Sequence, residues 1–320
     1  MNIFVQKPGI HTTVQDLGRY GYQKLGINPG GVMDPMAAKL VNILLGNGDN
    51  EAVLEMHFPA PRYLFDADAI CAIGGADFAP AVDGSAVDNW RPFFVSKGSV
   101  LSLETKRAGN RAYLAVSGGF KIEDWLGSAS TNIIAQAGGL SGRALRAGDE
   151  IELGSTQQLN FTIDSRKISQ SLIPVYSSHP TVRVVAGAEL DRLSSKGRKI
   201  FLKNHFSVSA HSNRMGFRLT GEQIALSSPL EIISSSVSVG TIQLLPDGQL
   251  ILLMADHQTT GGYPRIAHVI SYDLPLAAQL GPNDKVTFQL IDIKEAEDLL
   301  MQFEKNLSFL RVACRFQTNF

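Results

Sequence analysis

A segment near residue 260 concentrates polar and glycine residues that could bind and transform a small polar molecule. Residues 256–264 read Asp-His-Gln-Thr-Thr-Gly-Gly-Tyr-Pro and follow the apolar run 250–254. Loops at strand ends often carry function, and paired glycines let backbone amides approach a ligand closely. Asp256 or His257 could accept a proton there; the alternative is an elaborate hairpin whose side chains satisfy turn amides. The candidate substrate-binding residues of this segment are Gln258, Thr259, Thr260, Gly261, Gly262 and Tyr263.

A second polar cluster lies near the start of the chain, where residues 9–21 read Gly-Ile-His-Thr-Thr-Val-Gln-Asp-Leu-Gly-Arg-Tyr-Gly. Asp16, a candidate catalytic residue, and Arg19 are within the reach of one turn. Such a set can recognise a carboxylate or ureido group by paired hydrogen bonds. Spacing alone favours the alternative, a capped turn with a structural Asp16–Arg19 ion pair. The candidate substrate-binding residues here are Thr12, Thr13, Gln15 and Arg19.

Two further segments carry cationic or glycine-rich patterns. Arg214 could clamp an anion with its guanidinium group and is a candidate catalytic residue, whereas Arg218 alternates with Phe217 and Leu219 and is expected to face solvent on a strand. The glycines of residues 137–143 could form a nest of backbone amides for an anion. Such a loop is usually only a turn.

General signatures of catalysis and cofactor binding are missing. The chain has no GxxxxGK[ST] phosphate loop, no GxGxxG, no HExxH and no GxSxG. His205 and His211 are six residues apart, a spacing that suits neither a helical nor a strand ligand pair, so no metal site is expected. No Met-Lys-Met-like acceptor is present, so we expect no covalent biotin on this chain.

Short strands are the elements expected to position these residues. β-branched and aromatic runs alternate with turns rich in Gly, Pro, Asn and Asp, which favours barrels or sandwiches over a doubly wound sheet. The 30 glycines agree with frequent tight turns. The runs expected to form strands are 70–73, 93–95, 100–103, 111–116, 182–185, 241–245, 250–254 and 286–291.

Few helices are expected. Asp34 can cap and Pro35 can begin a helix over residues 36–45 that stops at Gly46. A shorter helix is expected after Asp273. Apolar residues at helical spacing predict an amphipathic C-terminal helix over residues 294–307.

Bulk composition restricts the partners and the compartment. The 320 residues are 44% apolar and 18% charged with a net charge of −1, which excludes the basic footprint of a nucleic-acid or anionic-membrane binder. The two cysteines form no CxxC pair, and Cys71 lies in an apolar run, as expected for a buried thiol. With no signal-like or membrane-spanning run, the chain is expected in a reducing, cytoplasmic compartment.

Taken in order, these segments resemble one family over residues 6–297. Residues 9–21 resemble its G-x-x-T-T-V-Q-D-x-G-R-x-G signature almost letter for letter. The family comprises KipA, the C subunit of 5-oxoprolinase (allophanate hydrolase subunit 2) and the matching part of the biotin-dependent carboxyltransferase domain of urea carboxylase. The other blocks that carry the resemblance are 30–34, 42–47, 51–55, 111–119, 213–216, 240–243 and 256–264.

The resemblance implies a mainly β fold of two cyclophilin-like β-barrel domains in tandem with a few short helices. We expect these domains at residues 1–160 and 181–320, the second with the C-terminal helix, joined by a linker at 161–180. The resemblance also implies activation of a lactam or urea amide, with Gln243 joining the substrate-binding residues. It leaves open which residue is the base.

Three functions follow from the resemblance. The first is the C subunit of an ATP-dependent 5-oxoprolinase, inactive alone, which works with a KipI-like B subunit and with a lactam-specific A subunit; ATP would be bound largely by a partner. The second is a biotin-dependent carboxyltransferase component acting on urea or a related amide. The third is a KipA-like regulator that binds a KipI-like kinase inhibitor.

Three departures weaken the assignment of a substrate. Ala129 stands in residues 127–131, where the family often has an arginine, and Ala188 stands where a proline often follows Gly187. His257 replaces an arginine that usually follows the aspartate.

Overall fold

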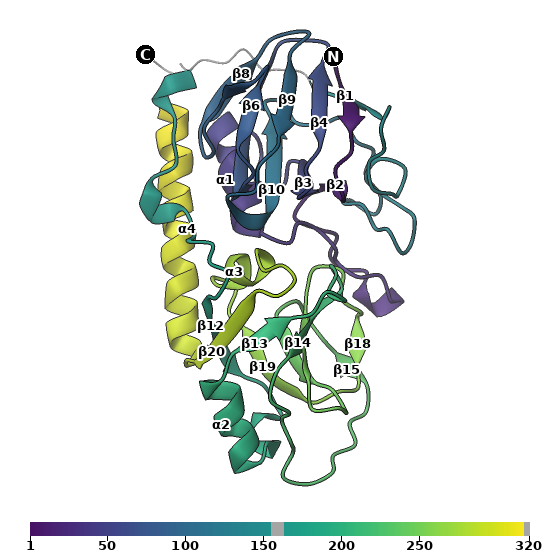
Figure 1. The fold of residues 1–320 in the computed structure, drawn as a ribbon, viewed down its shortest axis with the longest axis vertical. Coiled ribbons are helices and arrows are strands. Elements are labelled where there is room, and N and C mark those ends of the chain that lie inside the picture. Colours follow the sequence, from purple (N-terminus) through teal and green to yellow (C-terminus); the bar gives the residue numbers. More distant parts are fainter. Residues whose placement is uncertain (155–162, 317–320) are drawn as a thin grey trace. The chain divides into compact units, whose positions relative to one another are not determined.

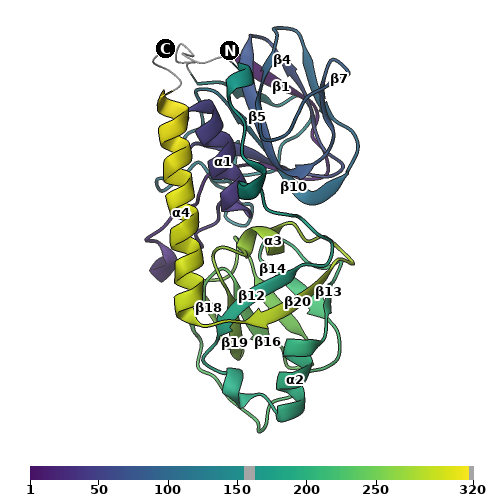
Figure 2. The ribbon, with the colours of Figure 1, turned by 90° about the vertical axis from the view of Figure 1, so that its left-hand side faces the viewer.

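The computed structural model describes residues 1–154 and 163–316 (Figures 1 and 2). The chain divides into two compact units. Unit 1 comprises Met1–Arg19, Gly30–Pro174 and Lys305–Phe320, and unit 2 comprises Tyr20–Pro29 and Val175–Glu304. Most elements are short strands, so the mainly β prediction is confirmed. The unit boundary after Pro174 falls inside the proposed linker at 161–180. The proposed division did not include two assignments: residues 20–29 belong to unit 2, and residues 305–320 belong to unit 1.

The strands of unit 1 form two sheets. A six-stranded sheet has the order β11-β1-β4-β9-β6-β7, and a five-stranded sheet has the order β2-β3-β10-β5-β8. Residues of both sheets, among them Phe65 and Leu114, share one buried apolar cluster. The strands are β1 (Asn2–Lys7), β2 (Thr12–Gln15), β3 (Val53–His57), β4 (Arg62–Phe65), β5 (Ala69–Asp77), β6 (Pro80–Val82), β7 (Ser85–Ala86), β8 (Pro92–Val95), β9 (Val100–Leu103), β10 (Ala108–Val116) and β11 (Glu150–Glu152).

Helix α1 (Pro35–Leu45) packs against β5 and β10 of the five-stranded sheet (Figure 2). The Asp34 side chain accepts a hydrogen bond from the Ala37 amide, Pro35 occupies the first turn, and Gly46 ends the helix in the left-handed conformation. The predicted cap, start and stop of this helix are therefore confirmed. The described chain also contains four short 3-10 helices: Gln23–Leu25, Ile163–Ser165, Gln170–Leu172 and Leu190–Arg192.

Unit 2 contains a closed seven-stranded barrel with the order β12-β19-β16-β17-β14-β13-β20. All neighbours are antiparallel except β12 and β20, which run parallel. The antiparallel pair β15–β18 forms a separate two-stranded sheet outside the barrel. The strands are β12 (Thr181–Ala186), β13 (Phe206–Val208), β14 (Gly216–Thr220), β15 (Ser235–Ser236), β16 (Thr241–Leu244), β17 (Leu250–Leu253), β18 (Thr260–Gly261), β19 (Arg265–Val269) and β20 (Lys285–Leu290).

Three further helices lie in the part of the chain after residue 190. α3 (Leu274–Ala278) comes after Asp273 as predicted, and α4 (Ile293–Phe316) is longer than the predicted helix over residues 294–307. α2 (Ser195–Lys203) was not predicted from the sequence; the Ser194 hydroxyl caps it by accepting from the Gly197 amide. No helix in the described part of the chain is long and apolar enough to cross a membrane.

Candidate functional site

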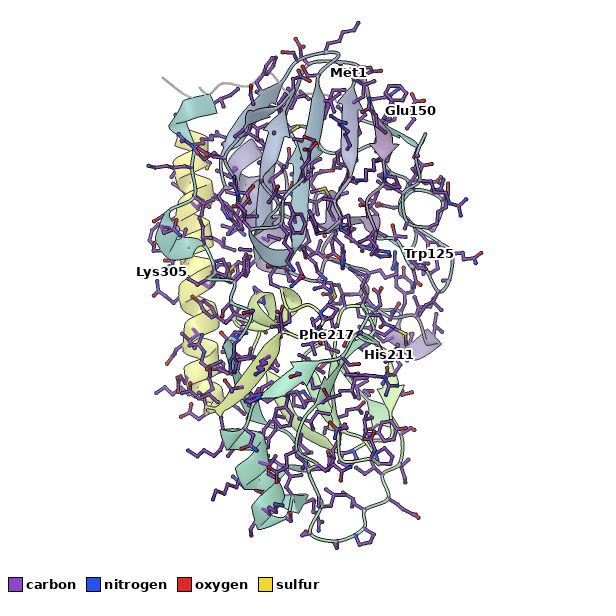
Figure 3. The ribbon with its side chains drawn as sticks, viewed as in Figure 1. Met1, Trp125, Glu150, His211, Phe217 and Lys305 are labelled. Carbon is purple, nitrogen blue, oxygen red and sulfur yellow. The ribbon has the colours of Figure 1, made fainter. Side chains whose placement is uncertain are left out.

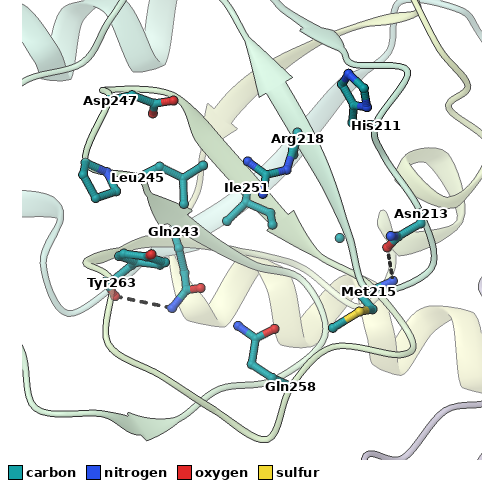
Figure 4. A pocket seen from close by; sticks show the side chains of 12 residues that line it. His211, Asn213, Met215, Arg218, Gln243, Leu245, Asp247, Ile251, Gln258 and Tyr263 are labelled. Carbon is teal, nitrogen blue, oxygen red and sulfur yellow. Dashed lines mark hydrogen bonds between the residues drawn. The ribbon is translucent and has the colours of Figure 1, made fainter. Parts of the chain in front are cut away.

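A cavity of about 470 Å³ lies on the outer face of the unit 2 barrel (Figure 4). Pockets of this size hold small molecules. Its wall brings together three predicted substrate-binding residues, Gln243, Gln258 and Tyr263, although they lie up to 20 positions apart in the chain. Arg218, Asp247, Ile251 and His211 also line the cavity.

Strand register sets the floor of this cavity. Ile251 of β17 is the direct partner of Gln243 on β16 and of Arg218 on β14. Side chains directly opposite each other on neighbouring strands share one face of a sheet. Phe217, labelled in Figure 3, is buried on β14 and alternates with Arg218. Gln243, Ile251 and Arg218 therefore form a row on the outer face.

The Gln243 carboxamide is fully buried beneath the 258–263 loop. Its Nε2 donates to the Tyr263 carbonyl at 3.4 Å, and its Oε1 has no hydrogen-bond partner among the described residues. Because the Tyr263 carbonyl can only accept, this contact assigns the nitrogen and leaves the buried oxygen as the unpaired acceptor. A Cβ at Gly261 would lie 2.7 Å from Nε2, so a larger residue there would displace the Gln243 carboxamide.

Arg214 and Asp256 form a bidentate ion pair. Arg214 Nε donates to Asp256 Oδ2 at 2.8 Å and Nη2 donates to Oδ1 at 3.0 Å. Their side chains are 8% and 14% exposed, and the Asp256 amide donates to the Arg214 carbonyl at 2.8 Å. Both carboxylate oxygens thus accept hydrogen bonds from Arg214, which makes Asp256 a fixed partner of the guanidinium group.

His257 follows this pair and is 3% exposed. Its Nδ1 lies 2.6 Å from the Gln258 carbonyl oxygen, which can only accept, so Nδ1 carries the proton. Burial lowers the pKa of His257 below its usual value, which keeps the ring neutral at neutral pH. The Nε2 lone pair is then the basic position, and no hydrogen bond within residues 1–154 and 163–316 engages it.

The predicted site residues of residues 9–21 lie in unit 1. Thr12, Thr13, Gln15, Asp16 and Arg19 are all buried. Gln15 Nε2 donates to Thr13 Oγ1 at 3.0 Å, and Thr12 Oγ1 donates to the Pro8 carbonyl at 2.8 Å. These contacts stabilise the start of the chain around β2.

Asp16 holds the segment 128–130. Its Oδ1 accepts from Ser128 Oγ at 2.7 Å and Ser130 Oγ at 2.5 Å, and its Oδ2 accepts from the Ala129 amide at 2.8 Å. Arg19 donates from Nη2 to the Ser130 carbonyl, and its guanidinium group lies 4.6 Å from the Trp125 ring centroid. Both residues thus anchor the segment 128–130.

Sequence reasoning missed a buried polar group on β3 and β10. Glu55 Oε2 accepts from the Met33 amide at 2.7 Å and from the Tyr113 hydroxyl at 3.0 Å. His57 Nε2 lies 3.8 Å from Glu55 Oε1. A glutamate inside the otherwise apolar run 53–56 was the available signal.

Arg218 was expected to face solvent. It is exposed as expected, but it also lines the cavity.

The glycine-rich loop 137–143 offers little to an anion. The amides of Ala137, Gly139 and Gly142 donate to the carbonyls of Asn132, Ala129 and Gly138. Arg143 forms a bidentate pair with Asp149. Within the described residues, no group of three His, Cys, Asp or Glu side chains is arranged to hold a metal ion.

Comparison with known proteins places the chain in a family. The model of the carboxyltransferase domain, subdomain A and B, matches residues 25–290. The chain belongs to this family. It is 35% identical to the C subunit of the Haemophilus influenzae 5-oxoprolinase over 299 residues, which is 93% of this chain and 94% of that protein. The protein of the same name from Escherichia coli is 33% identical over 291 residues, 91% of each chain.

A solved structure of a related protein has the same architecture as this chain. The K. lactis urea amidolyase superposes with a TM-score of 0.91 at 27% identity, over 97% of this chain. The matched part is 20% of the amidolyase chain. The expected relation to both 5-oxoprolinase subunits and urea-carboxylating enzymes is thereby confirmed.

Proposed function

We propose that this chain is the C subunit of a multi-subunit 5-oxoprolinase, which opens 5-oxo-L-proline to L-glutamate with consumption of ATP. The observation that carries the proposal is the 35% identity to the C subunit of a 5-oxoprolinase over more than nine-tenths of both chains. The expected partners are a KipI-like B subunit and a lactam-specific A subunit. The isolated chain is expected to be inactive.

The ring-opening step needs a base and donors for a developing oxyanion. The hydroxyl of water adds to the lactam carbonyl carbon, the C–N bond breaks, and the ring nitrogen takes a proton. His257 directly precedes Gln258 of the cavity wall; it is neutral, its Nδ1 is fixed on the Gln258 carbonyl, and it is the proposed base through Nε2. The Arg214–Asp256 pair positions the backbone that carries His257, because the Asp256 amide also binds the Arg214 carbonyl.

The described residues do not fit the triphosphate of ATP. The chain contains no GxxxxGK[ST] loop, and the amides of the glycine-rich loop 137–143 named above are already bonded. We therefore assign nucleotide binding to the partner subunits, and no step in this chain is derived through ATP.

The test is glutamate release from 5-oxo-L-proline by this chain co-expressed with its neighbouring subunits. ATP-dependent glutamate that disappears when this chain is omitted, and falls strongly in His257→Gln, is the expected result. His205→Gln, an exposed histidine of the same unit, is the matched control. An assembled complex that releases no glutamate would contradict the proposal.

A second candidate is a carboxyltransferase component that acts on urea or a related amide with biotin carried elsewhere. The likeness to the K. lactis urea amidolyase supports it. ATP-dependent, biotin-dependent carboxylation of urea by a reconstituted assembly, without glutamate release from 5-oxo-L-proline, would establish it instead.

A further inference from the structure

We propose that the cavity on β14, β16 and β17 binds a cyclic amide that bears a carboxylate, with Gln243 pairing to the cis amide and Arg218 to the carboxylate. The inference rests on the proposed function and deepens it, because it states which side chain binds which atoms of the substrate.

The Gln243 carboxamide is prepared for such a pairing. Its side chain is 0% exposed, and Oε1 has no partner among the described residues. Its Nε2 carries two hydrogens, of which one goes to the Tyr263 carbonyl. One acceptor and one donor therefore remain on a single planar group. An unsatisfied buried acceptor is costly, so a ligand N–H that reaches Oε1 gains strongly.

The pairing selects the geometry of the amide. A ring holds its amide cis, which puts N–H and C=O on the same side, where they can meet Oε1 and Nε2 of one carboxamide together. Open-chain secondary amides are trans and point these groups in opposite directions. Such amides can make only one of the two bonds. Lactams and urea meet the requirement, whereas peptides do not.

Arg218 distinguishes a lactam that bears a carboxylate from urea, which has none. It lies two strands from Gln243 across Ile251, which places the two Cα atoms roughly 10 Å apart at ordinary strand spacing. This distance suits a small ring with its carboxylate turned toward Arg218 and its apolar atoms over Ile251. No carboxylate among the described residues pairs with Arg218, so its guanidinium group can take a bidentate carboxylate.

The other charged group of the cavity is Asp247, whose Oδ1 accepts from the Gln249 amide at 3.0 Å in the β16–β17 turn. Figure 4 shows Asp247 at the far end of the cavity from Gln258, while the Gln258 and Gln243 carboxamides extend into the same space. His211, also on the wall, is exposed in the loop before β14. The arrangement thus leaves the carboxylate subsite to Arg218.

The experiment measures equilibrium binding to the assembled complex without ATP, with 5-oxo-L-proline, 2-pyrrolidone (the same ring without a carboxylate) and urea as probes. We expect Gln243→Leu to weaken 5-oxo-L-proline and 2-pyrrolidone alike, by about 10–100-fold. Arg218→Met should weaken 5-oxo-L-proline by at least about 10-fold and leave 2-pyrrolidone unchanged. Gln289→Leu, at an exposed position on β20 of the same barrel, is the matched control and should change neither.

This crossed pattern cannot result from misfolding, since misfolding would weaken both rings in Arg218→Met. A complex that releases glutamate while both variants bind 5-oxo-L-proline as tightly as the parent would overturn the inference and leave the proposed function standing. A complex that releases no glutamate but binds urea through Gln243, independently of Arg218, would overturn the proposed function and the carboxylate subsite together.

Discussion

Arg214 and Asp256 join two segments 42 residues apart through two parallel hydrogen bonds of 2.8 and 3.0 Å. A backbone bond from the Asp256 amide to the Arg214 carbonyl runs beside them. The loop before β14 and the turn after β17 are thus tied at the point where His257 begins the polar loop. The pair serves the position of that loop, which explains why a carboxylate so close to the proposed base need not be the base itself.

Removal of one member of this pair should cost more than removal of both. Asp256→Asn removes the carboxylate charge that pairs with Arg214, whose side chain is 8% exposed, and we expect a loss of about 3–5 kcal/mol in the free energy of unfolding. Arg214→Met combined with Asp256→Leu should lose less. Denaturant unfolding of the isolated chain measures both. Asp191→Asn, which breaks the exposed pair with Arg198, is the control and should stay within about 1 kcal/mol of the parent. Equal losses for Asp256→Asn and this control would contradict the argument.

Asp16 should act on stability through the segment 128–130. Asp16→Ala removes the acceptor of the Ser128 and Ser130 hydroxyls and of the Ala129 amide. Buried donors without a partner cost about 1–3 kcal/mol each, so we expect a total loss of about 3–5 kcal/mol and fast hydrogen exchange at the Ala129 amide.

The matched control for Asp16 is Asp83→Asn. Asp83 accepts from the Val100 amide at 2.8 Å in an exposed turn with a positive φ of 48°, which asparagine tolerates well. We expect no change at Ala129 in this variant. Slow exchange at Ala129 in Asp16→Ala would show that the carboxylate does not hold the segment.

His57 should make unit 1 less stable in acid. Burial, together with the nearby Arg111 charge, lowers its pKa from 6.5 to about 4, against the opposing effect of Glu55. Above pH 6.5 both the folded and the unfolded states are neutral at this ring. Between pH 6.5 and 4 the unfolded state binds a proton that the folded state excludes, so stability falls by about 3 kcal/mol.

The measurement is the free energy of unfolding at pH 7 and pH 4 for the parent and His57→Gln. The parent should lose about 3 kcal/mol more than the variant, because the variant lacks the His57 ring while all other titrating groups are the same in both proteins. His205→Gln, an exposed histidine, should lose as much as the parent. Identical pH dependence in the parent and His57→Gln would refute the assignment.

Local signals predicted the elements well. Asp34, Pro35 and Gly46 were read correctly because a cap, a first-turn proline and a left-handed glycine act within a few residues of each other. Helix α2 was missed because its charged, glycine-containing run shows no apolar stripe; its buried residues are Gly197, Ile200 and Phe201. The closure of the barrel through the parallel pair β12–β20 joins residues about 100 positions apart, which no local pattern reports.

The candidate site was predicted only in part for the same reason. Gln258 and Tyr263 were proposed from the polar loop that contains them. Arg218 lines the cavity because it pairs with Ile251 on the neighbouring strand, and strand pairing cannot be read from the local sequence. Asp16 and Arg19 were expected to pair with each other at turn spacing. Instead, each forms hydrogen bonds with the segment 128–130, more than 100 residues away.

The pH dependence of the complex provides a test of His257 as the base. Burial lowers the pKa of His257 below 6.5, while the Gln258 carbonyl and Asp256 oppose this shift. A base must be neutral to accept a proton, so kcat/KM for 5-oxo-L-proline should fall in acid with a limb centred below pH 6.5. His257→Gln should lower kcat/KM by about 100–10,000-fold and abolish the acid limb, because glutamine does not titrate. His205→Gln should keep both the rate and the limb. An acid limb centred above pH 6.5, or one that survives in His257→Gln, would assign the proton transfer to another group.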